Sequence, residues 1–244
     1  MKHLSKGIFA GVALATVVAT GAWAAGSFNN VEPHQFDPAH SFLVQAAWLS
    51  GIGCPTNAPY AVYPATDPNA TYTACPTGDT KDKRNEGLLL AKTGPTPNNA
   101  SAVANLKDVK GTALTELGYD IRKPGLNVND PRGSHCGAGA PRFDITLQNG
   151  DSYFLGCNSP APTSDTPEGA NQEWQRLRWG GSSPLLAFNA STFTLDNISG
   201  KVVKSISIVF DEGQDTAPDN FGLAVLDNVD VNGVLVGDGP TNAG

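Results

Sequence analysis

Five carboxylates gather near the C-terminal end of the chain, where they could hold a cation. They are Asp211, Glu212, Asp215, Asp219 and Asp227. No Lys or Arg follows Lys204, so this part of the sequence supplies no local counter-ion. Calcium takes about six to eight oxygens from carboxylates, carbonyls and water, and the amide of Asn220 or Asn228 could contribute. The spacing does not match an EF-hand loop. We therefore predict a calcium site, with a solvated acidic loop rich in Asp and Asn turns as the open alternative.

A second candidate for chemistry is the stretch WQRLRW, which could bind a ligand on a sheet face. Strand alternation places Trp174, Arg176 and Arg178 on one face. Leu177 and Trp179 take the other face, and if they enter the core the first face is exposed. An aromatic ring beside two guanidinium groups can stack on a sugar and bind hydroxyls or a carboxylate. The alternative is an outer face that carries only cation–π contacts and ion pairs.

We predict no catalytic residues, although whether the chain is an enzyme stays open. Gly150-Asp151-Ser152 resembles the nucleophile block of GDS-type lipases, but no His follows His135 and the G-x-S-x-G elbow is absent. Paired carboxylates for glycoside hydrolysis are compatible with the sequence, because spacing along a chain does not fix spacing in space. Most of the acids lie in polar loops, however, where an apolar pocket that would raise a catalytic pKa is not expected.

The elements that must position these residues read as short strands. Apolar residues alternate in LGYDI, in RFDITL and in ISIVF, and Asn149-Gly150 and Asn232-Gly233 mark hairpin turns. Residues 38–49 fit either a helix, with Asp37 as its N-cap, or a strand. Charged residues make up only 16% of the chain, whereas there are 27 Gly and 18 Pro. This pattern predicts an all-β fold, an antiparallel β-sandwich with long loops.

The ending GLAVLDNVDVNG resembles the last strand of jelly-roll β-sandwich modules, which include galactose-binding-like and carbohydrate-binding domains. The resemblance covers roughly the last strands of the domain and implies a jelly-roll-like topology. Many such modules carry a structural calcium near a sheet edge, and Asp227 occupies the matching position. The resemblance therefore implies Asp227 as a calcium ligand and glycan as a partner.

The cysteines and the N-terminus predict export. Residues 1–24 form a signal peptide, with a basic start, an apolar run and an Ala22-Trp23-Ala24 cleavage signal. Four cysteines follow it, and in an oxidising compartment they predict two disulfides. Three pairings are possible. The sequential pairing, Cys54–Cys75 and Cys136–Cys157, closes two short loops. We expect a secreted protein, extracellular or periplasmic, from a bacterium, with a flexible lead-in at 25–36, one domain at 37–237 and a flexible tail at 238–244.

Three functions fit these features. The first is a non-catalytic glycan-binding or surface-interaction module stabilised by calcium. The second is a structural or self-assembling envelope or matrix protein, and the third is a glycan hydrolase or lyase on a jelly-roll scaffold. A net charge of −7 with no basic run argues against nucleic-acid binding. No apolar segment after the signal peptide has the length to span a membrane.

Overall fold

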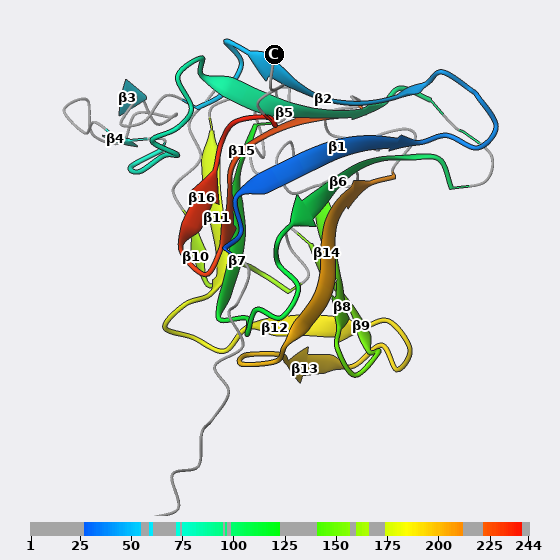
Figure 1. The fold of residues 1–244 in the computed structure, drawn as a ribbon, viewed down its shortest axis with the longest axis vertical. Coiled ribbons are helices and arrows are strands. Elements are labelled where there is room, and N and C mark those ends of the chain that lie inside the picture. Colours follow the sequence, from blue (N-terminus) through cyan, green and yellow to red (C-terminus); the bar gives the residue numbers. More distant parts are fainter. Residues whose placement is uncertain are drawn as a thin grey trace, which may run out of the picture.

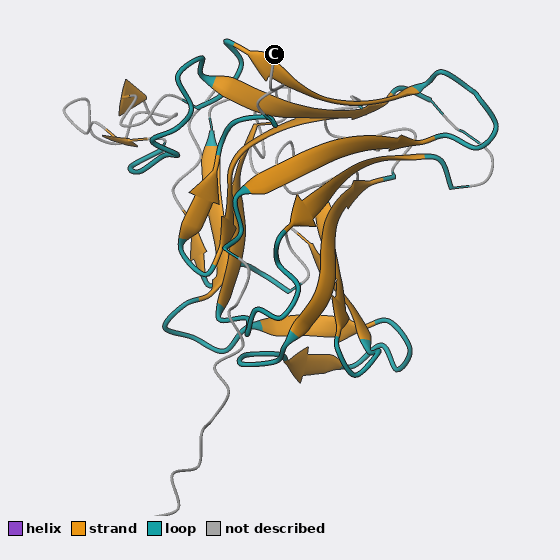
Figure 2. Cartoon of the chain, in the orientation of Figure 1, coloured by secondary structure: helices purple, strands orange, loops and turns teal. Residues whose placement is uncertain are grey.

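The computed structural model describes residues 27–54, 59–60, 72–73, 75–94, 96, 99–122, 141–156, 160–165, 174–211 and 222–240. These residues form an antiparallel, jelly-roll-like β-sandwich of two packed sheets, and none of them is helical (Figure 2). None of the described segments forms an apolar helix of membrane-spanning length.

Sheet A has seven strands. In spatial order they are β1 (Asn30–Phe36), β6 (Ser101–Lys107), β14 (Val203–Phe210), β8 (Arg142–Leu147), β9 (Ser152–Gly156), β12 (Leu186–Asn189) and β13 (Leu195–Asn197). Figure 1 shows it as a curved layer, with β1 at one edge and β13 at the other. Neighbouring strands pair antiparallel throughout.

Sheet B packs against sheet A. Its strands are, in spatial order, β10 (Ser164–Asp165), β11 (Gln175–Gly180), β7 (Glu116–Arg122), β15 (Leu223–Val231), β5 (Glu86–Lys92) and β2 (Val44–Ser50), with β16 (Val234–Val236) beside β15. A separate two-stranded ribbon joins β3 (Pro59–Tyr60) and β4 (Tyr72–Thr73). The strands β5, β6, β7 and β8 alternate between the sheets, as do β14 and β15, so the chain repeatedly crosses the core.

The core lies between the sheets, and strands such as β7 contribute every second residue to it. In β7, Leu117, Tyr119 and Ile121 are fully buried. The ring of Tyr119 lies 5.4 Å from that of Phe143 and 5.5 Å from that of Trp179, which joins both sheets in one aromatic cluster. The Tyr119 hydroxyl donates to the carbonyl of Pro141 at 2.8 Å, so its polar end is satisfied inside the core.

Strand β15 contains a bulge that decides which side chains leave the core. Leu226 and Val229 both point inward and are fully buried, although they are three positions apart. The ladder between β15 and β7 shifts register between Asp227 and Asp230, and Asn228 has a φ of 46°. An Asn tolerates this left-handed conformation better than most residues. The bulge therefore turns two successive polar side chains, those of Asp227 and Asn228, to the outer face of sheet B.

The structure confirms the strand reading of most segments and corrects two boundaries. The lead-in expected at 25–36 is wrong for Asn30–Phe36, which forms edge strand β1 with Val31 in the core. The tail expected from 238 is wrong for residues 238–240, because Gly239 is buried and its N–H donates to Glu86 at 2.7 Å. Of the two readings of residues 38–49, the strand is correct from Val44 onward. The hairpins at Asn149-Gly150 and Asn232-Gly233 are confirmed.

Candidate functional site

The outer face of sheet B, the side turned away from sheet A, carries an ion-pair network centred on Asp120. The Asp120 side chain has no exposed area. It accepts from Arg176 Nε at 2.8 Å and from Arg176 Nη2 at 2.8 Å, and Arg178 Nη1 lies 3.3 Å away. Asn228, turned outward by the bulge, donates its amide to the same carboxylate at 2.9 Å. Two guanidinium groups and an amide therefore compensate one buried charge.

Arg178 is held flat on the sheet. Its Nε lies 2.8 Å from Asp230 Oδ2, and the residue is 7% exposed. A Cβ at Gly118, directly opposite in β7, would collide with the Arg178 side chain. Burial, followed by the charge of Asp230 and a hydrogen bond to it, raises the pKa of the neighbouring Glu116. Glu116 and Asp230 thus lie close together beside Arg178, whose charge opposes the rise in the pKa of Glu116.

The chain segment that follows Cys75 covers this face. The disulfide Cys54–Cys75 packs with Trp174 and Val225 in a second small core, in which Trp174 is 5% exposed. The guanidinium of Arg122 lies 5.6 Å from the Trp174 ring centroid. Arg176 also donates to Thr77 Oγ1 at 2.7 Å.

The sequence predicted an open face of Trp174, Arg176 and Arg178 if Leu177 and Trp179 entered the core. Leu177 and Trp179 do enter the core, but the open face is wrong, because Trp174 and Arg178 are buried. Trp174 packs against the Cys54–Cys75 disulfide, and Arg176 donates to Thr77, which follows Cys75. Arg178 is held by Asp120 and Asp230 of the sheet itself. Their direct contact with a ligand stays a prediction, and their observed partners are protein groups.

Asp227 is buried beside this network. It is 1% exposed and accepts from the backbone N–H of Cys54 and of Asn228, each at 2.6 Å. Burial raises its pKa to about 8 against the opposing effect of these two N–H groups, and the charges of Asp120 and Asp82 raise it further. A pocket of about 220 Å³ opens next to it, lined by Cys54, Asp79, Asp82, Lys83, Asn85, Asp227 and Asn228.

Asp211 has a different environment, at the end of β14 in sheet A. Its two carboxylate oxygens accept from Arg142 Nη1 and Nη2, each at 2.7 Å. The hydrogen bond from Arg142 lowers the pKa of Asp211. Lys92, which is 5% exposed, donates its ammonium to the Asp211 carbonyl oxygen. No basic residue lies near Asp211 along the sequence, but the fold brings two basic residues to it, Arg142 from β8 and Lys92 from β5.

The predicted calcium ligands are not brought together in the part that the structure describes. Asp211 is paired with Arg142, and Asp227 is bonded to backbone N–H groups of a different region. The other three, Glu212, Asp215 and Asp219, lie outside the described residues, as do Cys136 and Cys157. Within the described ranges no group of three or more His, Cys, Asp or Glu residues is arranged to hold a metal ion.

The outer face of sheet A carries a row of side chains that the sequence analysis missed. The cross-strand register sets five residues in line over β14, β8, β9, β12 and β13. They are Ser207, Asp144, Phe154, Phe188 and Leu195, hereafter the sheet A row. Phe154 and Leu195 are 36% and 46% exposed. Alternation could have found this row, because Asp144 and Phe154 occupy the positions opposite to the core residues in RFDITL and SYFLG.

Arg142 lies beside the sheet A row and links its polar and aromatic members. Its guanidinium is 5.5 Å from the Phe154 ring centroid, and its Nε is 3.0 Å from Asp144 Oδ1. The Arg142 and Asp144 side chains are 30% and 32% exposed, so both reach solvent. Burial raises the pKa of Asp144, with Arg142 opposing that shift. The arrangement places hydrogen-bonding groups of both kinds next to an accessible aromatic ring.

No protein-family model and no curated protein matches the chain. Among solved structures, the chain is similar to the family 11 carbohydrate-binding module of the cellulosomal cellulase Lic26A-Cel5E of Clostridium thermocellum. The identity is 14% and the TM-score 0.37, over 88% of this chain and 92% of that one. The Clostridium thermocellum module in complex with a β-1,3-1,4-mixed-linked tetrasaccharide gives 16% identity and a TM-score of 0.34, over 86% and 99%.

A β-1,2-glucanase from Parabacteroides distasonis gives 13% identity and a TM-score of 0.35, over 84% of this chain and 24% of that one. At these scores the similarities say nothing about what this chain binds.

Proposed function

We propose that this protein is a non-catalytic glycan-binding module whose binding face is the outer face of sheet A. One observation carries the proposal: the sheet A row joins two cross-strand phenylalanines to a solvent-accessible Arg–Asp pair. The corresponding face of sheet B is filled by its own ion pairs and covered by a loop. Among the described strands, sheet A is therefore the sheet with polar and aromatic groups available to a ligand.

The chemistry of the row fits a sugar chain. Pyranose rings present apolar C–H faces that pack on aromatic side chains such as Phe154 and Phe188, while their hydroxyls both donate and accept hydrogen bonds. Asp144 can accept from two hydroxyls, and Arg142 can donate to one. Since strands lie about 4.8 Å apart, the row across five strands is roughly 19 Å long. That length suits an extended oligosaccharide better than a single small molecule.

Binding to a polysaccharide panel tests the proposal. We expect the protein to bind at least one neutral polysaccharide, measured on a glycan array and then by calorimetry. Phe154→Ala removes the stacking platform and should weaken binding about fivefold or more, because an aromatic contact of this kind contributes roughly 1 kcal/mol beyond its area.

Phe42→Ala is the matched control, because Phe42 is 86% exposed and lies outside the sheet A row. Absence of binding to every polysaccharide, with and without calcium, would remove the glycan assignment. Equal losses in Phe154→Ala and Phe42→Ala would remove the assignment to sheet A.

We further propose that the protein is exported and binds calcium. The disulfide Cys54–Cys75 supports export, because such bonds persist in oxidising compartments. The mass of the protein recovered from the exported fraction should correspond to a chain that starts near Ala25.

The calcium proposal rests on the five acids that the sequence places near its C-terminal end. The metal would be held by the loop that contains Glu212, Asp215 and Asp219.

A further inference from the structure

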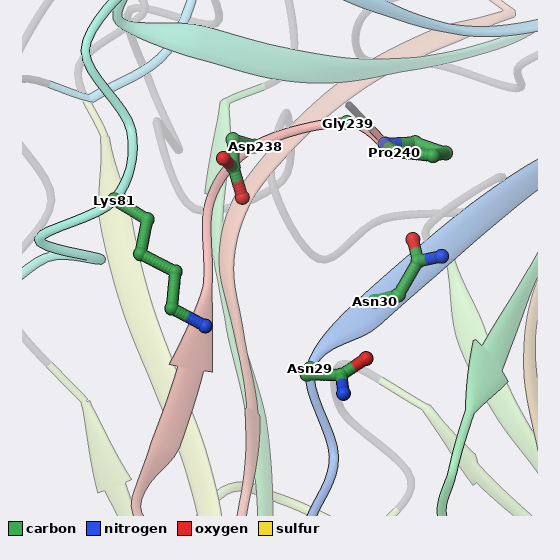
Figure 3. A pocket seen from close by; sticks show the side chains of 6 residues that line it. All are labelled: Asn29, Asn30, Lys81, Asp238, Gly239 and Pro240. Carbon is green, nitrogen blue, oxygen red and sulfur yellow. The ribbon is translucent and has the colours of Figure 1, made fainter. Parts of the chain in front are cut away.

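A second, separate pocket lies where the first residues of β1, the loop before β5 and the chain after β16 meet. It has a volume of about 310 Å³ and is lined by Asn29, Asn30, Lys81, Asp238, Gly239 and Pro240. Figure 3 shows these side chains around it, contributed by three segments that are far apart in the sequence. The volume is at the lower end of the range of small-molecule sites, about 300–1,000 Å³, so it suits one small ligand.

The walls of this pocket are fixed by hydrogen bonds. Gly239 donates its N–H to Glu86 Oε2 at 2.7 Å, and Gly237 donates to Asp79 Oδ2 at 3.1 Å. The indole of Trp48 donates to the carbonyl of Val31, next to Asn30, at 2.8 Å. A Cβ at Gly239 would lie 2.8 Å from the Trp48 side chain, so the tail reaches this position because it has glycine there. A ligand would meet walls that are already ordered, which lowers the entropic cost of binding.

The lining is polar and mixed in its hydrogen-bonding character. Two carboxamides, from Asn29 and Asn30, offer donors and acceptors, and the Lys81 ammonium offers donors. Asn30 Oδ1 is buried and accepts no hydrogen bond from the protein. A buried acceptor without a partner is costly, so a donor from a ligand would be favourable here.

The charges around the pocket disfavour an anionic ligand. Lys81 and Asp238 give it one group of each sign. Burial raises the pKa of Asp238, and the charge of Asp79 and a hydrogen bond to it act in the same direction. Asp82 and Glu86 add further negative charge nearby, which opposes an anionic ligand. A neutral ligand rich in hydroxyl groups uses the donors and acceptors of the lining without meeting this repulsion.

We propose that this pocket binds a single neutral pyranose unit through Asn29, Asn30, Lys81 and Asp238. The site is distinct from the sheet A row. Asn30 lies on β1, at the opposite edge of sheet A from β13, and pairs with Lys107 of β6. The proposal goes beyond glycan binding along sheet A, since it requires a site for one sugar ring.

Saturation-transfer NMR with the methyl pyranosides of glucose, galactose and mannose tests this site on the full exported chain. We expect signal from at least one of the three, and Asn30→Ala and Lys81→Met should each reduce it several-fold. Lys110→Met is the matched control, because Lys110 is an exposed lysine outside the pocket. Both Lys110→Met and Phe154→Ala should leave the signal unchanged. Glycine, a zwitterion of small size, should give no signal.

The outcomes separate this proposal from the sheet A proposal. No signal from any pyranoside, or a signal that the two pocket variants leave intact, overturns the pyranose pocket. A signal lost in Phe154→Ala but kept in Asn30→Ala also overturns it, because the sugar would then bind on sheet A. Pyranoside binding that depends on Asn30, in a protein that binds no polysaccharide, upholds the pocket and removes the sheet A proposal.

Discussion

At the scale of single residues, burial raises the pKa of several carboxyl groups around sheet B above its ordinary value. Asp227 is the strongest case, with a pKa raised from 3.8 to about 8, and the pKa values of Glu116 and Asp238 are raised as well. A group whose pKa rises on folding binds its proton more tightly in the folded chain. Its contribution to stability is complete below the unfolded pKa and is lost as the pH rises through the folded pKa.

The first prediction is therefore a fall in stability between about pH 4 and pH 8. We expect the free energy of unfolding to decrease by a few kcal/mol over this interval, since each unit of pKa difference corresponds to about 1.4 kcal/mol. Asp227→Asn replaces the carboxyl by a neutral group of the same shape and should flatten the decrease. Urea denaturation over a pH series measures it.

Asp108→Asn, at an exposed turn after β6, is the control and should retain the wild-type pH dependence. A pH profile that Asp227→Asn leaves unchanged would show that this carboxyl does not control stability.

At this scale, the sequence predicted on which face of a strand a side chain lies, but it did not predict which residues that side chain contacts. Alternation correctly placed Leu177 and Trp179 on one face, which the structure shows to be the core face. It could not show what lies over Arg176, because Asp120 and Thr77 are 56 and 99 positions away in the sequence. The absence of bases after Lys204 suggested unpaired acids. Asp211 nevertheless meets Arg142, since pairing in an antiparallel sheet brings distant strands together.

At the scale of elements, the period-two pattern predicted the strands that contribute several residues to the core. It missed β1, in which Val31 is the one core residue and Pro33 sits on an edge strand, where a missing N–H is tolerated. It also missed the bulge in β15. A bulge changes which residues face outward without changing their types, so Asp227 and Asn228 share a face that strict alternation would deny them.

The disulfide loop gives an element-scale prediction. Cys54–Cys75 ties the chain before the loop to the segment that covers Trp174. The double variant Cys54→Ala, Cys75→Ala should lower stability by about 3 kcal/mol, because the unfolded chain regains the freedom that the cross-link removes. It should also make Trp174 accessible to acrylamide quenching of fluorescence.

The same cysteine double variant in a Trp174→Phe background shows whether the increase in acrylamide quenching comes from Trp174. If quenching rises equally in both backgrounds, the exposed indole is not that of Trp174, and the loop does not shield this face. A wild-type stability in the double variant would likewise contradict a clamping role for the disulfide.

At the scale of the whole molecule, the fold class could be predicted because low charge, many turn-formers and alternating strands all favour a sandwich. The face that is free for a ligand could not be predicted from the sequence. The two sheets have similar strand patterns. They differ because the segment that follows Cys75 is hydrogen-bonded to the outer face of sheet B, through Thr77 and Asp79, whereas Phe154 on sheet A stays accessible. Such packing of a loop depends on its contacts, not on its own periodicity.

The calcium proposal is tested on the whole molecule, because a cation that binds the folded chain stabilises all of it. If calcium binds, EDTA lowers the Tm and added calcium restores it, with about 2.7 kcal/mol gained at a hundredfold excess over the Kd. The triple variant Glu212→Gln, Asp215→Asn, Asp219→Asn removes the charges of the proposed loop and should abolish the response.

Asp227→Asn distinguishes the two places where the metal could bind. A calcium response that survives this variant assigns the metal to the loop, while one that is lost with Asp227 alone assigns it to the region beside Asn228. Asp211→Asn should destabilise the protein with or without calcium, since its carboxylate is held by Arg142. A Tm that neither EDTA nor calcium changes would mean that the acids after β14 are a solvated loop and hold no metal.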